Sequence, residues 1–120
     1  MKITPTFPIP FGYTSIIKTA WNKGLMPSVK IGIYGGQLTP KNITIEHILP
    51  ISKGGKTALS NIALATYSNN IKRGSKPLRW FLDMDIFEKY LKQFENIEIM
   101  NFNGNKYIEA LTKTVERILK

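Results

Sequence analysis

The sequence predicts a small α+β domain, and three observations support this. The chain has 120 residues, which suits one compact domain and hardly two. Its middle part holds short β-branched segments separated by glycine pairs, which favour strands and turns. Its last part holds apolar residues at the spacing of amphipathic helices. With 42% hydrophobic and 21% charged residues, the composition is that of a globular protein.

Residues 1–28 are expected to form an N-terminal arm and a helix. The prolines of residues 1–12 predict an extended arm, for which a packed terminus is favoured over a segment that enters a groove. Thr14 or Ser15 would cap a helix that ends near Asn22, with Gly24 as its stop.

Residues 29–76 are expected to alternate strands and loops. The patterns predict a short strand over 29–33, a second over 43–47 that runs into Pro50, and a returning strand over 62–67. Ser68 or Asn69 would then cap a short helix that Gly74 and Pro77 bring to an end.

Residues 77–120 are expected to add two amphipathic helices to the same domain. Asp85, followed by Glu88 three residues later, has the chemistry of a capping box at the start of the first helix. A polar turn over 101–105, around Gly104, precedes a last helix over 107–118. Neither helix carries a recognisable site, so we expect both to pack behind the strands.

The composition excludes several kinds of protein and site. No apolar run approaches the ~18–20 residues of a membrane span, and Pro5, Pro8 and Pro10 interrupt the segment where a cleaved leader would be apolar. We therefore expect a cytoplasmic protein without membrane contact. The chain has no cysteine, which excludes disulfides, thiolate zinc sites and cysteine nucleophiles. Any metal must bind oxygen or imidazole.

Positive charge is concentrated in the first two-thirds of the chain. Residues 1–82 contain eleven basic side chains and one acidic one, Glu46, whereas residues 83–120 contain six basic and seven acidic ones. A positive field of this kind attracts polyanions such as nucleic acid. A solvated basic surface is the alternative interpretation of the same excess.

The single histidine lies in the most informative pattern of the chain. Glu46 directly precedes His47, Asn61 follows fourteen residues after His47, and Asn70 follows nine residues after that. The glycine pair at 54–55 and the basic run at 72–76 complete the pattern. Over about residues 29–76 it resembles the HNH endonuclease motif in its H-N-N form.

This resemblance implies a ββα-metal core and metal-dependent hydrolysis of phosphodiester bonds in DNA, leaving a 5′ phosphate. Glu46 and Asn70 offer hard oxygen donors, which suit one divalent ion, Mg²⁺ or Mn²⁺. Neighbouring side chains of a strand point to opposite faces, so one of Glu46 and His47 can face the metal and the other the water. His47 would face the water and act as general base. Asn61 cannot take up a proton, and the resemblance implies that it hydrogen-bonds across the hairpin and orients His47.

The expected partner is double-stranded DNA, whose phosphates five basic side chains would bind: Lys53, Lys56, Lys72, Arg73 and Lys76. No helix-turn-helix or zinc finger is visible. The chain would therefore cut loosely, read DNA through its basic N-terminal region, or form a homodimer to lengthen its footprint. By analogy with small stand-alone members of the family, a phage or mobile element would encode it.

The sequence departs from the family pattern in two places. Many relatives carry aspartate where Glu46 stands, so the metal must shift or the longer side chain must fold back. Many relatives also carry two CxxC pairs that hold a structural zinc. Here those places are taken by Gly32, Gly35, Thr66 and Asn69. The lost zinc removes folding energy, which the late helices are expected to supply.

Two alternatives to a DNA endonuclease stay open. The first is a catalytically silent DNA-binding or interaction protein on the same fold, since single asparagines such as Asn61 and Asn70 are more often turn or cap residues than ligands. The second is a nonspecific nuclease that acts on RNA. Metal-dependent nicking that requires His47 would distinguish a DNA endonuclease from the silent protein. A comparison of DNA and RNA substrates would distinguish it from the RNA nuclease.

Overall fold

The computed structural model of the chain describes residues 2–3, 16–99 and 102–120, which form an α+β domain with two small sheets. Its helices are α1 (Ile16–Asn22), α2 (Tyr67–Arg73), α3 (Leu78–Phe81), α4 (Met84–Lys92) and α5 (Gly104–Leu119). Its strands are β1 (Lys2–Ile3), β2 (Ile43–His47), β3 (Ile62–Thr66), β4 (Glu98–Ile99) and β5 (Phe102–Asn103). Two 3₁₀ turns, η2 (Ile51–Lys53) and η3 (Leu59–Asn61), lie between β2 and β3.

The antiparallel hairpin of β2 and β3 lies at the centre of the domain. Ile43 pairs with Thr66 at one end and His47 with Ile62 at the other. Every residue of β3 is buried, which fits its continuous apolar sequence and its position between other elements. Both strands were predicted from the sequence, and this hairpin confirms them.

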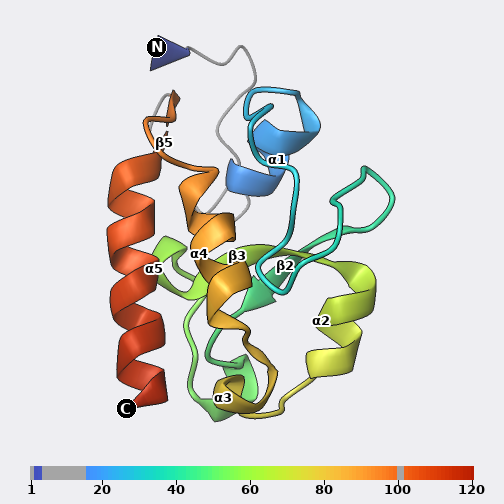
Figure 1. The fold of residues 1–120 in the computed structure, drawn as a ribbon, viewed down its shortest axis with the longest axis vertical. Coiled ribbons are helices and arrows are strands. Elements are labelled where there is room, and N and C mark those ends of the chain that lie inside the picture. The colour runs from blue at the N-terminus through green and yellow to red at the C-terminus, as the bar shows by residue number, and fades with distance from the viewer. Residues whose placement is uncertain (1, 4–15, 100–101) are drawn as a thin grey trace.

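α2 follows β3 without a loop. The Thr66 hydroxyl accepts a hydrogen bond from the Asn69 N–H and caps the helix, and Gly74 ends it. The helix and its glycine stop were predicted, but the expected caps, Ser68 and Asn69, lie inside it. α2 stands on the right of the hairpin in Figure 1, with α4 and α5 on the left.

α4 and α5 pack behind the hairpin, as expected, and two buried tyrosines join them to it. The Leu64 N–H donates to the Tyr90 hydroxyl at 2.9 Å, and the Tyr107 hydroxyl donates to the Ile62 carbonyl at 2.8 Å. The two hydroxyls lie 2.9 Å apart, and Tyr90 is the donor because the Tyr107 proton is used on Ile62. These bonds satisfy polar groups along the outer edge of β3, which would otherwise be buried without partners.

The second sheet has the strand order β1-β4-β5, with β1 parallel to β4 and β4 antiparallel to β5. The start of the expected arm is therefore a strand, while residues 4–12 and the caps Thr14 and Ser15 lie outside the described residues. The predicted turn at 101–105 is replaced by β5 and the start of α5, which Asn103 caps. Asn101 is also outside the described residues.

Three other local predictions differ from the structure. Residues 29–33 form no strand, only one bridge between Ile31 and Gln37, because the Gly32 Cα lies against the backbone of β3 and the chain turns there. The cap of α4 is Asp83 rather than Asp85. α3 was not expected at all. The predicted helix ending at Asn22 is confirmed as α1.

None of the described helices combines the length and the apolar character needed to cross a membrane.

Replacing Tyr107 by Phe tests the tyrosine connection. The variant leaves the Ile62 carbonyl without its partner and the Tyr90 hydroxyl without its acceptor, so we expect the free energy of unfolding to fall by about 1–3 kcal/mol. Urea unfolding followed by circular dichroism measures this. The exposed Tyr67→Phe serves as control, with an expected change within about 0.5 kcal/mol. Equal stability of the two variants would contradict the assignment.

Candidate functional site

α2 lies against the end of β2, and each element presents one face to the other. The Asn70 Nδ2 donates to the Thr44 hydroxyl at 2.9 Å and to the Ile45 carbonyl at 3.1 Å. One turn later, the Arg73 Nη1 contacts the Glu46 Oε2 at 3.2 Å. Residues three apart on a helix share a face, as do residues two apart on a strand. Glu46 and Asn70, the expected metal ligands, therefore stand on facing surfaces.

The Glu46 carboxylate is buried and paired within the protein. Its Oε2 accepts hydrogen bonds from the Tyr34 hydroxyl at 2.6 Å and from the Arg73 Nη1. Arg73 is only 1% exposed. Its Nη1 also donates to the His47 carbonyl at 3.0 Å, and its Nε donates to the Lys76 carbonyl at 3.0 Å. One guanidinium thus connects β2, α2 and the turn after α2.

The burial of Arg73 differs from the exposed phosphate contact that the sequence predicted for it. The Nε and Nη1 atoms of this guanidinium donate to a carboxylate, a hydroxyl and two carbonyls inside the protein. Its role in this structure is to neutralise Glu46 and to hold the hairpin against the helix. Two features of the sequence hint at this ion pair. Glu46 is the single acid among residues 1–82, and Arg73 lies one helical turn from Asn70.

Tyr34 is a site residue that was not predicted from the sequence. Burial, together with the neighbouring Glu46 carboxylate, raises the pKa of the Tyr34 hydroxyl well above its usual range. The phenol therefore stays protonated and serves as a donor to Glu46. Its ring packs edge-on against Phe81 of α3, with ring centroids 4.9 Å apart. Tyr34 carries no local motif, and only its contacts reveal it.

His47 is half-buried at the end of β2, on the opposite face of the strand from Glu46. Its Nε2 lies 3.2 Å from the Thr57 hydroxyl, an exposed contact with the loop between the strands. The ring is thus accessible at the surface, and the main chain behind it is fixed by Arg73. Thr57, like Tyr34, is a residue near the site that was not predicted from the sequence.

Asn61 fastens the loop that follows His47. Its Oδ1 accepts from the Leu49 N–H at 2.8 Å, and its Nδ2 donates to the carbonyls of Leu49 and Lys56 at 3.1 and 2.8 Å. Gly55 completes this loop, because a Cβ there would lie 1.7 Å from the Leu49 carbonyl oxygen. These are bonds across the hairpin, as expected, but they hold the loop backbone rather than the His47 ring.

Four residues that stand where the HNH pattern often has cysteines lie close together in this structure: Gly32, Gly35, Thr66 and Asn69. Gly32 packs against the backbone of Ala65 and Thr66. The Asn69 Nδ2 donates to the carbonyls of Tyr34 and Gly35 at 3.4 and 3.2 Å. Hydrogen bonds and backbone packing thus join the turn at residues 32–36 to the start of α2.

The remaining basic residues of the predicted site are exposed: Lys53, Lys56, Lys72 and Lys76. The Lys53 Nζ donates to the Ser75 carbonyl at 2.9 Å, and the Lys76 Nζ donates to the Lys72 carbonyl at 2.6 Å. These bonds hold two ammonium groups at the turn that follows α2, where they remain accessible to a phosphate.

The donor chemistry of Glu46 and Asn70 fits a hard divalent ion. Among the described residues, the Glu46 Oε1 and the Asn70 Oδ1 have no protein hydrogen-bond partner. The described part of the chain contains no group of three or more acidic or histidine side chains able to hold a metal. Mg²⁺ commonly binds one or two carboxylates and completes its shell with water and phosphate. Such an ion would share the Glu46 carboxylate with Arg73.

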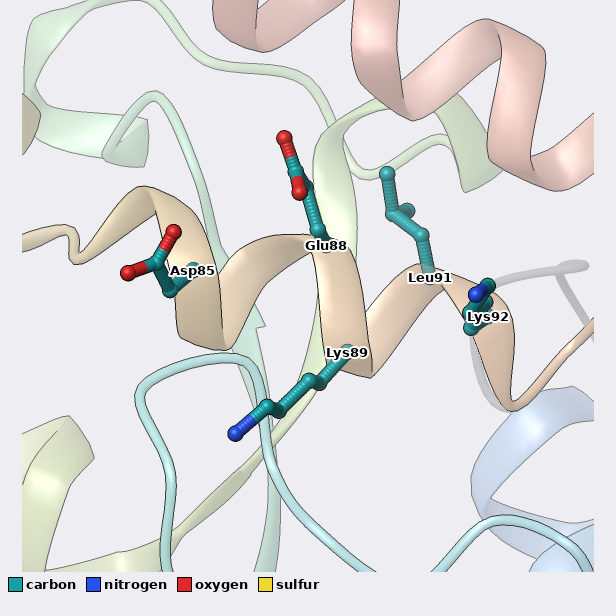
Figure 2. A pocket seen from close by; sticks show the side chains of 5 residues that line it. All are labelled: Asp85, Glu88, Lys89, Leu91 and Lys92. Atoms are coloured by element: carbon teal, nitrogen blue, oxygen red, sulfur yellow. The ribbon is translucent and has the colours of Figure 1, made fainter.

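A separate hollow lies along α4 and offers no comparable chemistry. Figure 2 shows its lining side chains, Asp85, Glu88, Lys89, Leu91 and Lys92, all from this one helix. Acidic and basic groups project from it in different directions.

Comparison of the chain with protein-family models, with curated proteins and with solved structures found no match. The HNH resemblance therefore rests on the residue spacing of the sequence.

Replacing Arg73 by Met tests the buried pair. The variant leaves the Glu46 charge buried without its counter-ion, so we expect the free energy of unfolding to fall by about 3–5 kcal/mol. Lys72→Met is the matched control on the adjacent, exposed position and should stay within about 0.5 kcal/mol. Urea unfolding of both variants checks this, and a neutral effect of Arg73→Met would show that the pair is not a stabilising element.

Proposed function

We propose that this chain is a metal-dependent endonuclease of the HNH type that hydrolyses phosphodiester bonds in DNA. The observation that carries the proposal is that a β-hairpin followed directly by a helix bears the H-N-N spacing. Its histidine is accessible at the strand end, and oxygen donors of Glu46 and Asn70 stand on facing surfaces.

The positions of the missing zinc ligands support the same proposal. Gly32 and Gly35 meet Thr66 and Asn69 across the turn and the start of α2, although these residues are far apart in the sequence. In this chain, hydrogen bonds from Asn69 would join the turn to the helix in place of the structural zinc.

In the proposed reaction, His47 takes a proton from the attacking water, a role typically worth ~10²–10⁴ in rate. Asn61 keeps the loop beside it in place, and Arg73 fixes the His47 main chain. Glu46 and Asn70 would hold the ion through the Oε1 and Oδ1 atoms. When bound, a divalent ion supplies charge stabilisation to the phosphate and the leaving oxygen. Lys53, Lys56, Lys72 and Lys76 would contact neighbouring phosphates.

A second candidate function is a DNA-binding protein that does not cut. The observation that favours it is the pairing of Glu46 with Arg73 and Tyr34, which already neutralises the one carboxylate of the site. The two functions share the basic surface and differ in whether His47 has chemical work to do.

Nicking of a supercoiled plasmid decides between them. We expect the wild-type chain to nick DNA with Mg²⁺ or Mn²⁺ and to stop when a chelator is added. His47→Ala should lower the rate by roughly 10²–10⁴-fold, because the proton acceptor is lost. Circular dichroism and DNA binding should be unchanged, and Ser60→Ala, an exposed change in the same hairpin, should cut like wild type.

Equal nicking by wild type and His47→Ala would contradict the enzyme, and binding without nicking would favour the silent protein. Single-stranded DNA and structured RNA are compared under the same conditions. Faster cleavage of RNA than of DNA would show that RNA is the substrate instead of DNA.

A further inference from the structure

α3 turns two of its four side chains inward and two outward. Leu78 is buried, and Phe81 packs edge-on against Tyr34. Arg79 and Trp80 lie between them in the sequence and face solvent. Trp80 is 71% exposed, more than any other large hydrophobic residue among those described. Because Leu78 and Phe81 already anchor the helix, Trp80 contributes little to the core.

The exposed charges before and within α3 are positive, whereas Asp83 and Asp85 follow it at the start of α4. Between residues 47 and 82 every exposed charged side chain is basic: Lys53, Lys56, Lys72, Lys76 and Arg79. Lys53 and Arg79 line one hollow, together with Pro50 and Pro77. The Lys53 ammonium donates to the Ser75 carbonyl between α2 and α3, and the Lys76 ammonium donates to the Lys72 carbonyl at the end of α2. Trp80 is thus a large exposed aromatic group at a basic turn.

Side-chain contacts join α3 to the candidate site. Phe81, the next residue after Trp80, contacts Tyr34, and the Tyr34 hydroxyl bonds to Glu46. α3 therefore keeps a fixed position relative to β2. A ligand on its outer face would lie at a constant place beside the site.

We propose that Trp80, with Arg79 and the lysines of this turn, binds single-stranded nucleic acid, one base stacking on the exposed indole. Aromatic stacking requires a base whose face is open, which unpaired nucleotides offer and a duplex interior does not. The basic side chains complement the phosphates on either side. A protein partner is less well matched, since the outer face of α3 presents Trp80 beside Arg79 and the exposed charges that precede it are basic.

This inference deepens the proposed function by naming unpaired nucleotides as part of the substrate. The statement about the substrate rests on the proposed nuclease function. Binding itself requires no cleavage. The test therefore measures binding in chelator, where failure of the nuclease and failure of the stacking surface are distinguishable.

The experiment measures fluorescence anisotropy of a labelled twelve-nucleotide oligo-dT with the full chain. Trp80→Ala should weaken binding by roughly 5- to 150-fold, the range that loss of one stacked base produces. Trp80→Phe, which keeps an aromatic face, should retain more affinity than Trp80→Leu, which keeps only apolar bulk. Met84→Ala is the control, because Met84 is also exposed and apolar but lies between Asp83 and Asp85. It should bind like wild type.

Tryptophan emission gives an independent readout of stacking. The chain has two tryptophans, and Trp21 is half-buried with its Nε1–H bonded to the Val29 carbonyl. Oligo-dT should quench the wild-type emission and leave that of Trp80→Phe, which reports Trp21 alone, unchanged.

Three results would overturn the proposal: wild-type affinity in Trp80→Ala, equal affinity of Trp80→Leu and Trp80→Phe, or tighter binding of a twelve-base-pair duplex with no effect of Trp80. The second would indicate a general apolar contact, as expected of a protein-docking surface. Plasmid nicking that fails while Trp80-dependent binding persists would contradict the nuclease and leave this surface standing.

Discussion

The buried contact between Arg73 and Glu46 is the interaction on which the rest of the site depends. A guanidinium removed from water is costly unless carboxylate and carbonyl oxygens surround it. Arg73 meets this condition with Glu46, Tyr34 and the main-chain carbonyls of His47 and Lys76. The end of β2, the end of α2 and the turn around Tyr34 are therefore fixed by one group. The same group sets where His47 and Asn70 stand.

This pairing gives Glu46 two tasks in the proposed enzyme. One carboxylate oxygen accepts from Tyr34 and Arg73, and the other has no partner among the described side chains. A cation held by that oxygen would lie beside a guanidinium, and repulsion between them would be offset by the negative phosphate of a bound substrate. Metal and substrate would then bind more strongly together than separately.

The sequence predicts those parts of the fold that local patterns determine. The strand at 43–47 is rich in β-branched residues, the strand at 62–66 is a short apolar run, and α5 has a regular apolar face, so local patterns alone find them. Residues 29–33 alternate apolar residues with Lys30 and Gly32 but form a turn, because Gly32 packs against β3. The roles of Tyr34 and Arg73 depend on contacts across twelve and 27 residues of sequence, which no local pattern records. The spacing of His47, Asn61 and Asn70 was visible, whereas the burial of their neighbours was not.

A double-mutant cycle on the free energy of unfolding tests this account most directly, with Glu46→Gln, Arg73→Met and the combined variant. Each single change leaves one buried charge without its partner, and the combined change removes both charges. The account predicts that the double variant loses less stability than the two single losses added together, by about 1–3 kcal/mol. Losses that add to within about 0.5 kcal/mol would show that the two side chains do not depend on each other and would contradict it.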